Sequence, residues 1–138
     1  YELGAQLGRA VMDAGVARIH RPTGVTGPLA GAAAGAHLCG LDDIAFTSAL
    51  ALAANGSAGF NQWAWTGGSE MFFQAGFAAR HAVSCVTLAA AGAFGSPNAI
   101  DGEAGLCAAL GKPDAGSRLQ PFADTPEILA VYHKAVPA

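Results

Sequence analysis

Charged side chains are scarce in this sequence. Asp, Glu, Lys and Arg make up 12% of its 138 residues, whereas hydrophobic residues make up 52%. An average soluble domain carries about 25% charged residues, and this chain is long enough for one domain with a core of its own. We therefore expect something to cover part of its surface: the rest of a larger protein, another subunit or, less readily, a membrane.

Basic clusters are absent as well. The seven Lys and Arg residues are scattered from Arg9 to Lys134, and the net charge is −3. Nucleic-acid binding needs a concentrated basic surface, so we expect no nucleic-acid partner. Residues 44–69 carry no charge, but Asn, Gln, Ser and Gly interrupt them. The uninterrupted apolar part falls short of the roughly 20 residues that span a bilayer, so we expect no membrane span.

The common motifs of metal and nucleotide sites are also missing. The three Cys residues and the four His residues have no metal-ligand spacing, so we expect neither a metal nor another cofactor. The stretch GLCAALGKP at 105–113 differs from a Walker A loop, because Pro113 stands where Ser or Thr would hold Mg²⁺. Three Cys without a close pair predict buried free thiols in a reducing cytoplasm.

Small residues and helical periodicity dominate what is present. The chain has 33 Ala and 19 Gly, and its apolar residues recur at helical spacing. Pro22 disfavours helix at Arg21, so RIHRPTG at 18–24 is expected to be a connector. No stretch alternates cleanly enough to predict a strand, although 129–136 leaves that option open. We expect helices at 1–16, from Thr26 or Pro28 to Cys39, at 42–54, at 69–91, at 101–110 and in a short stretch from Asp124.

The predicted fold class is therefore all-α, an Ala/Gly-rich packed helical bundle. Within the second expected helix, Gly27, Gly31 and Gly35 lie four residues apart. Residues at this spacing share one face of a helix, and glycines there let a neighbouring helix approach closely. Because the membrane span fails on length, we interpret this row as tight helix packing inside a bundle.

Few polar residues stand out as candidates for chemistry. His20 lies in a Pro/Gly connector, where functional residues concentrate, and histidine is a common proton donor and acceptor in active sites. A solvated loop His is the alternative. Arg80 lies within an apolar helix, either paired with a carboxylate at a packing boundary or holding an acidic substrate. Nothing local distinguishes Lys134 from a surface Lys.

Several segments, in order, resemble the MmgE/PrpD family, which includes 2-methylcitrate dehydratase, cis-aconitate decarboxylase and iminodisuccinate epimerase. YELGAQLGRA resembles the family's Tyr-Glu helix, and HRPTGVTGPLAGAAAGAHLCGLD resembles its His–Thr segment and Ala-rich helix. GSEMFFQAGFAARHAVSCVTLAAAG resembles its long Gly-x-Ala-Ala-Arg helix, and a later Gly-Leu pair ends the matching stretch. KAVPA resembles the Lys-x-x-Pro element that enters a second domain. The resemblance covers nearly the whole chain.

The resemblance implies a homodimer of two-domain subunits. Residues 1–133 would be a segment of the helical domain, and 134–138 would begin the junction to an α+β domain. A start at Tyr1 and an end at KAVPA fit a segment of a longer polypeptide, although processing would also remove an initial Met.

The implied activity is that of a cytoplasmic, metal-independent lyase or isomerase. Such an enzyme abstracts a proton next to the carboxylate of a small carboxylic acid. His20 would be the general acid or base, and Lys134 would bind a carboxylate or stabilise enolate charge. Thr23 and Arg80 are weaker candidates for substrate contact.

One departure from the family pattern bears on the substrate. Dehydratase- and decarboxylase-like members carry a Lys and a His where this chain has Met71 and Gln74. The loss of a cation favours a substrate less acidic than a tricarboxylate. The alternative to an enzyme is a non-catalytic helical scaffold or dimerisation module, in which His20 and Lys134 would lie far apart and face solvent.

Overall fold

The computed structural model describes residues 1–119 and 125–131, and these residues form helices joined by turns and loops. Within these ranges there is no strand, and the one β-bridge joins His20 to Phe60. The predicted all-α fold class is confirmed. In chain order the elements are α1 (Glu2–Val11), α2 (Ala14–Ile19), α3 (Pro22–Leu38), α4 (Asp43–Asn55), α5 (Trp63–Thr66), α6 (Glu70–Ala90), α7 (Leu106–Ala109) and the 3₁₀ helices η1 (Pro113–Arg118) and η2 (Glu127–Ala130).

The first expected helix is two helices. The Asp13 carboxylate accepts a hydrogen bond from the Val16 N–H at 2.9 Å and so caps α2. The single helix predicted over 1–16 is therefore interrupted at Asp13. The Asp13 carboxylate also contacts the Lys112 ammonium. Hydrogen bonds from Lys112 and from the Val16 N–H hold the pKa of Asp13 below its usual value. Asp13 therefore joins the start of α2 to the turn before η1.

Helix α3 begins at Pro22, earlier than the predicted start at Thr26 or Pro28. Pro22 occupies the first turn, where its missing N–H costs nothing. Pro28 lies inside the helix and leaves the Gly24 carbonyl without its usual partner. The Ala58 N–H supplies that hydrogen bond at 3.1 Å. The helix thus tolerates an interior proline because a loop replaces the lost donor.

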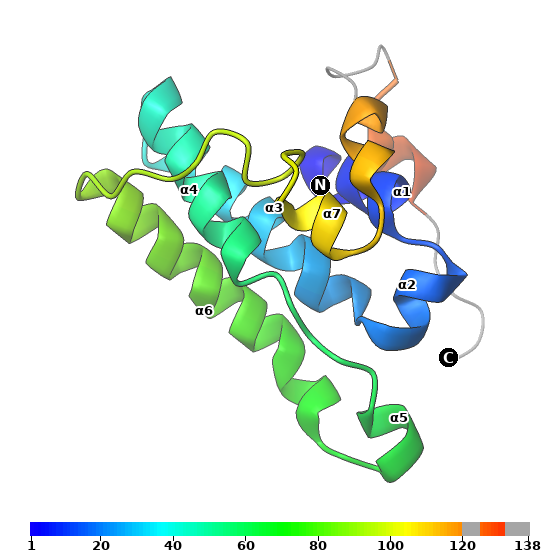
Figure 1. Ribbon diagram of the computed structural model, residues 1–138. Helices are drawn as coiled ribbons and strands as arrows, with labels where there is room; N and C mark the ends of the chain where they lie inside the picture. The colour runs from blue at the N-terminus through cyan, green and yellow to red at the C-terminus, as the bar shows by residue number, and fades with distance from the viewer. Residues whose placement is uncertain (120–124, 132–138) are drawn as a thin grey trace.

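The glycine row of α3 packs against α6, as its spacing predicts. A methyl group added to Gly31 would lie 2.8 Å from Cβ of Ala82, closer than such atoms approach in proteins. One added to Gly27 would lie 3.0 Å from Cβ of Ala78, and Gly35 faces Val86 in the same way. Figure 1 shows α3, α4 and α6 alongside one another, with α1 on the other side of α3.

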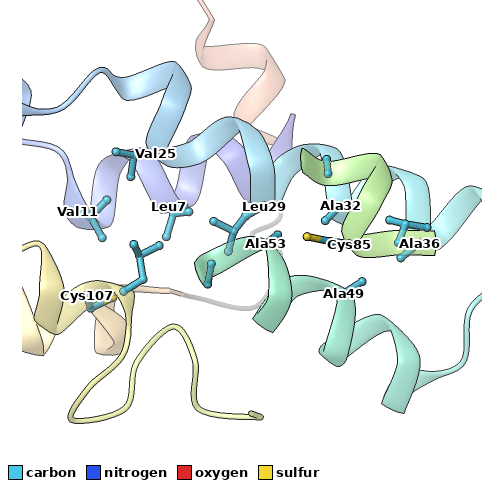
Figure 2. Packing of buried hydrophobic residues seen from close by; sticks show 14 of the residues in the cluster. Leu7, Val11, Val25, Leu29, Ala32, Ala36, Ala49, Ala53, Cys85 and Cys107 are labelled. Atoms are coloured by element: carbon cyan, nitrogen blue, oxygen red, sulfur yellow. The ribbon is translucent and has the colours of Figure 1, made fainter. Parts of the chain in front are cut away.

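Small side chains fill the core between these helices. Figure 2 shows Leu29, Ala32 and Ala36 of α3 among residues from α4, α6 and the segment near α7. Cys85 and Cys107 are buried free thiols, and burial raises the pKa of each. Cys39 is exposed, contrary to the prediction of buried thiols, because it lies just past the end of α3.

Among the remaining elements, α5 and η1 fall where no helix is predicted, and two others differ from expectation in length. Asp42 caps α4 through the Ala45 N–H at 2.8 Å, as predicted. The helix expected from Asp101 begins at Leu106, because turns occupy the residues before it. The last expected helix is the single 3₁₀ turn η2, and its predicted start at Asp124 lies outside the described residues. None of the described helices is both long enough and apolar enough to cross a membrane.

We expect Gly31→Ala and Gly76→Ala to change stability in opposite directions. Both glycines are helical, and Ala is the better helix former by about 0.5–1 kcal/mol. A methyl group at Gly76 meets nothing within 4 Å, whereas one at Gly31 overlaps Ala82. Overpacking of this kind costs about 1–3 kcal/mol, so Gly31→Ala should be the less stable variant by about that amount. Urea unfolding measures the difference, and equal stabilities would show that α3 and α6 are not in tight contact.

Candidate active site

His20 occupies the junction between α2 and α3. Its N–H donates to the Val16 carbonyl at 2.8 Å and ends α2, and its own backbone is extended. Helix α3 starts two residues later. The side chain is therefore held between two helix ends, and the connector predicted over residues 18–24 is reduced to His20 and Arg21.

Residues 58–61 run antiparallel to this junction. The Asn61 N–H donates to the Ile19 carbonyl and the Arg21 N–H to the Gly59 carbonyl, each at 2.9 Å. The Asn61 side-chain amide donates to the carbonyls of Ala17 at 2.7 Å and His20 at 3.0 Å. The extended backbone at His20 thus has partners from a segment 40 residues further along the chain.

Two glycines make this pairing possible. A Cβ atom at Gly24 would overlap the Ala58 carbonyl oxygen, so only glycine lets the segment lie directly on α3. Gly59 has φ +115°, a conformation that side chains with a Cβ rarely adopt. The sequence thus places glycine on both sides of the contact that holds His20.

The His20 imidazole lies against Phe60, with ring centroids 5.6 Å apart and planes tilted by 41°. Its Nδ1 atom is buried and has no hydrogen-bond partner among the described residues. A buried nitrogen without a partner is costly, and such groups call for an explanation such as a catalytic role. In chemical terms His20 retains hydrogen-bonding capacity that the described fold does not use.

His20 lines a cavity of about 410 Å³ between α2 and the turn that follows α7. Lys112 and Asp13 line the same cavity as an ion pair, so the imidazole shares this cavity with a lysine whose charge Asp13 balances. Sequence reasoning did not single out Lys112, because it is 92 residues from His20 and lies in a Gly-Lys-Pro helix stop. No local pattern predicts this proximity.

The other predicted site residues are distributed differently. Thr23 is exposed in the first turn of α3, three residues from His20. Arg80 is exposed on α6 with its guanidinium 5.5 Å from the centre of the Phe77 ring, and it forms no ion pair within the described part of the chain. Arg80 lines another cavity, of about 290 Å³. Lys134 lies outside the described residues.

Met71 and Gln74, where the family resemblance led us to expect Lys and His, lie at the start of α6. Gln74 is 7% exposed, and its amide donates to the Phe60 carbonyl at 3.1 Å. Met71 is half-buried one turn earlier. Gln74 therefore ties α6 to the residue that contacts the His20 ring, and neither side chain supplies a charge.

Within residues 1–119 and 125–131, no group of three or more His, Cys, Asp and Glu side chains is arranged to hold a metal ion.

We expect Asn61→Ala to loosen the pairing around His20. The substitution removes both side-chain hydrogen bonds to the Ala17 and His20 carbonyls. Each such loss costs about 0.5–1.5 kcal/mol, so the free energy of unfolding should fall by about 1–3 kcal/mol. Hydrogen exchange at Arg21, whose amide bonds Gly59, should accelerate. Ser57→Ala is the control, because its hydroxyl bonds only within the end of α4; equal exchange in both variants would contradict the role of Asn61.

Comparison with known proteins adds one match. The family model described as the MmgE/PrpD N-terminal domain matches residues 1–117, a span that includes His20, the glycine row and α6. No curated protein matched the chain. The chain belongs to the MmgE/PrpD family.

Proposed function

We propose that the protein is a metal-independent lyase or isomerase that abstracts a proton next to the carboxylate of a small carboxylic acid. Membership of the MmgE/PrpD family suggests a lyase- or dehydratase-like enzyme when the protein is full length. The observation that carries the proposal is the setting of His20. This residue is held between two helix ends, its Nδ1 atom has no hydrogen-bond partner among the described residues, and it lines a cavity together with Lys112. We expect such an enzyme to work in the cytoplasm.

In the proposed reaction, His20 removes the proton from the carbon next to the carboxylate. The electron pair moves toward the carboxylate and forms an enolate, whose charge needs a nearby cation. We assign that role to Lys134, and the resemblance of KAVPA to the family's Lys-x-x-Pro element supports this assignment. The enolate then expels a hydroxyl group from the next carbon, which leaves as water with a proton from His20, or the first carbon regains a proton on its other face. If the substrate loses CO₂ instead, the bond to CO₂ breaks in place of the C–H bond, and His20 as general acid protonates the resulting carbanion.

Thr23 is the proposed substrate contact nearest to His20. Its hydroxyl lies in the first turn of α3, a rigid position from which to donate a hydrogen bond. Arg80 lines a different cavity from His20, so we propose that it binds an anionic group there. With Met71 and Gln74 at these positions, the start of α6 offers no cation, which favours a less acidic substrate than a tricarboxylate.

A second candidate function, dimerisation, is favoured by the outer face of α6. Large apolar side chains are exposed along this helix: Phe72, Phe73, Phe77, Val83 and Leu88 are each more than half exposed. Exposed apolar surface of this kind marks interaction sites in soluble proteins. We propose that this α6 face is the contact between the two subunits of a homodimer. A scaffold without catalysis would still use the α6 face.

Replacing His20 tests the catalytic proposal. We expect His20→Ala in the full-length protein to lower the turnover number by about 10²–10⁴-fold, the usual contribution of a general acid or base. Circular dichroism and the melting temperature should stay close to those of the parent. His37→Ala is the matched control, because His37 is exposed in the last turn of α3. Full turnover in His20→Ala would refute the assignment and support the scaffold.

A charge on the α6 face tests the homodimer. Phe73 is 55% exposed, and Phe73→Glu would place a carboxylate in the proposed contact, where burying it is costly. We expect the parent to sediment as a dimer and Phe73→Glu to shift toward the monomer. Leu38→Glu, at the exposed end of α3, is the control. A monomeric parent, or an unchanged dimer in Phe73→Glu, would contradict the proposal.

A further inference from the structure

An aromatic groove lies next to His20 and shares Ile19 with the cavity that His20 and Lys112 line. It has a volume of about 640 Å³ and is lined by Arg18, Ile19, Phe60, Gln62 and Trp65. Its large apolar side chains are exposed to solvent: Ile19 is 59% exposed, Phe60 62% and Trp65 73%. We refer to these five residues as the aromatic groove. Its volume is in the range of small-molecule sites, which are lined mostly by apolar and aromatic side chains with few polar groups.

The aromatic groove is continuous with the candidate active site. Ile19 directly precedes His20, and Phe60 pairs with His20 through the backbone bridge. The Phe60 ring also lies against the imidazole, at 5.6 Å between centroids. One ring therefore forms a wall of the groove and contacts the proposed catalytic group. A ligand stacked on Phe60 would lie next to His20.

The charge of the aromatic groove comes from one residue. Of the five described lining residues, Arg18 alone is ionisable, and it forms no ion pair within the described part of the chain. The neighbouring Arg21 differs, because its guanidinium stacks over Trp63 at 5.3 Å from the ring centre. Arg18 is thus an available cation beside two exposed aromatic rings.

These features select one class of ligand. A single guanidinium matches a single carboxylate, and aromatic walls match a planar apolar ring. A tricarboxylate carries two further carboxylates for which the groove offers no second cation. The neutral Met71 and Gln74 point the same way. The groove therefore complements a monocarboxylic acid that carries an aromatic ring.

We propose that the aromatic groove is the substrate-specificity site, with Arg18 binding the carboxylate and Phe60 and Trp65 stacking on the ring of an aryl-substituted acetic acid. This inference rests on the proposed function, in which His20 acts on the bound acid. In such an acid the carbon that loses its proton lies between the ring and the carboxylate. Both substituents stabilise the carbanion that forms when His20 takes the proton. The ring and the carboxylate that the groove would bind are therefore also the groups that make the reaction possible.

Calorimetric titration of the full-length protein tests the proposal with three probes: phenylacetate, its neutral analogue phenylacetamide, and tricarballylate, a tricarboxylate. We expect phenylacetate to bind most tightly. Arg18→Gln should weaken phenylacetate about tenfold, toward the affinity of phenylacetamide, because it removes a charge-assisted hydrogen bond. Arg9→Gln is the matched control, since Arg9 is an exposed arginine of α1 that pairs with Glu127 of η2 and does not line the groove.

Tryptophan fluorescence gives an independent measurement. Trp65 and Trp63 are the two Trp residues of this chain, and Trp65→Phe removes the exposed one while keeping a ring in the groove. Phenylacetate should change the emission of the parent, and Trp65→Phe should abolish that change. Both variants replace exposed side chains, and circular dichroism checks that each keeps its fold.

The outcomes separate this inference from the proposed function. The specificity site would be overturned if tricarballylate bound more tightly than phenylacetate and if neither Arg18→Gln nor Trp65→Phe changed the binding of phenylacetate. This holds even if His20→Ala abolishes turnover. Arg18-dependent binding of phenylacetate, with full turnover in His20→Ala, would support the groove as a binding site and refute the catalytic role of His20. If none of the three probes binds, the inference is overturned. If the emission of Trp65 then also changes when the protein is diluted, the groove is a contact between copies of the protein, because dilution separates them.

Discussion

The close approach of α3 and α6 is the constraint on which the other features of the structure depend. Gly27, Gly31 and Gly35 leave room for Ala78, Ala82 and Val86, so the two backbones lie nearer than larger side chains would allow. This contact explains the abundance of small residues in a chain with so little charge. It also fixes α3 along its length, so that its first turn, next to His20, becomes a rigid position.

From that first turn the structure leads to the candidate site through backbone groups. Pro28 frees the Gly24 carbonyl, which accepts from Ala58, and the pairing continues through Gly59 and Asn61 until His20 is held from both sides. Gln74 of α6 then binds the carbonyl of Phe60, whose ring contacts the imidazole. Helices α3 and α6, which form the tight contact, therefore also bind the segment 58–61 that pairs with His20.

Local signals in the sequence predicted much of the fold and little of the site. The all-α class, the Asp42 cap and the packing of the glycine row each depend on residues within one or two turns of a helix. The apolar periodicity continues through Asp13, so it does not reveal that the Asp13 carboxylate caps a new helix there. The start of α3 at Pro22 is also not predicted, because the residue before a proline disfavours helix and the proline therefore suggests a connector. Phe60 and Lys112 come close to His20 only through tertiary contacts, which no spacing in a single sequence reveals.

The central claim is that His20 and Lys134 act on one substrate. The most direct test is a crystal structure of the full-length protein with a carboxylic acid bound. Our account predicts that the His20 imidazole and the Lys134 ammonium both lie within hydrogen-bonding distance of that ligand. A structure in which the two side chains are far apart and face solvent, with the acid bound elsewhere, would contradict it.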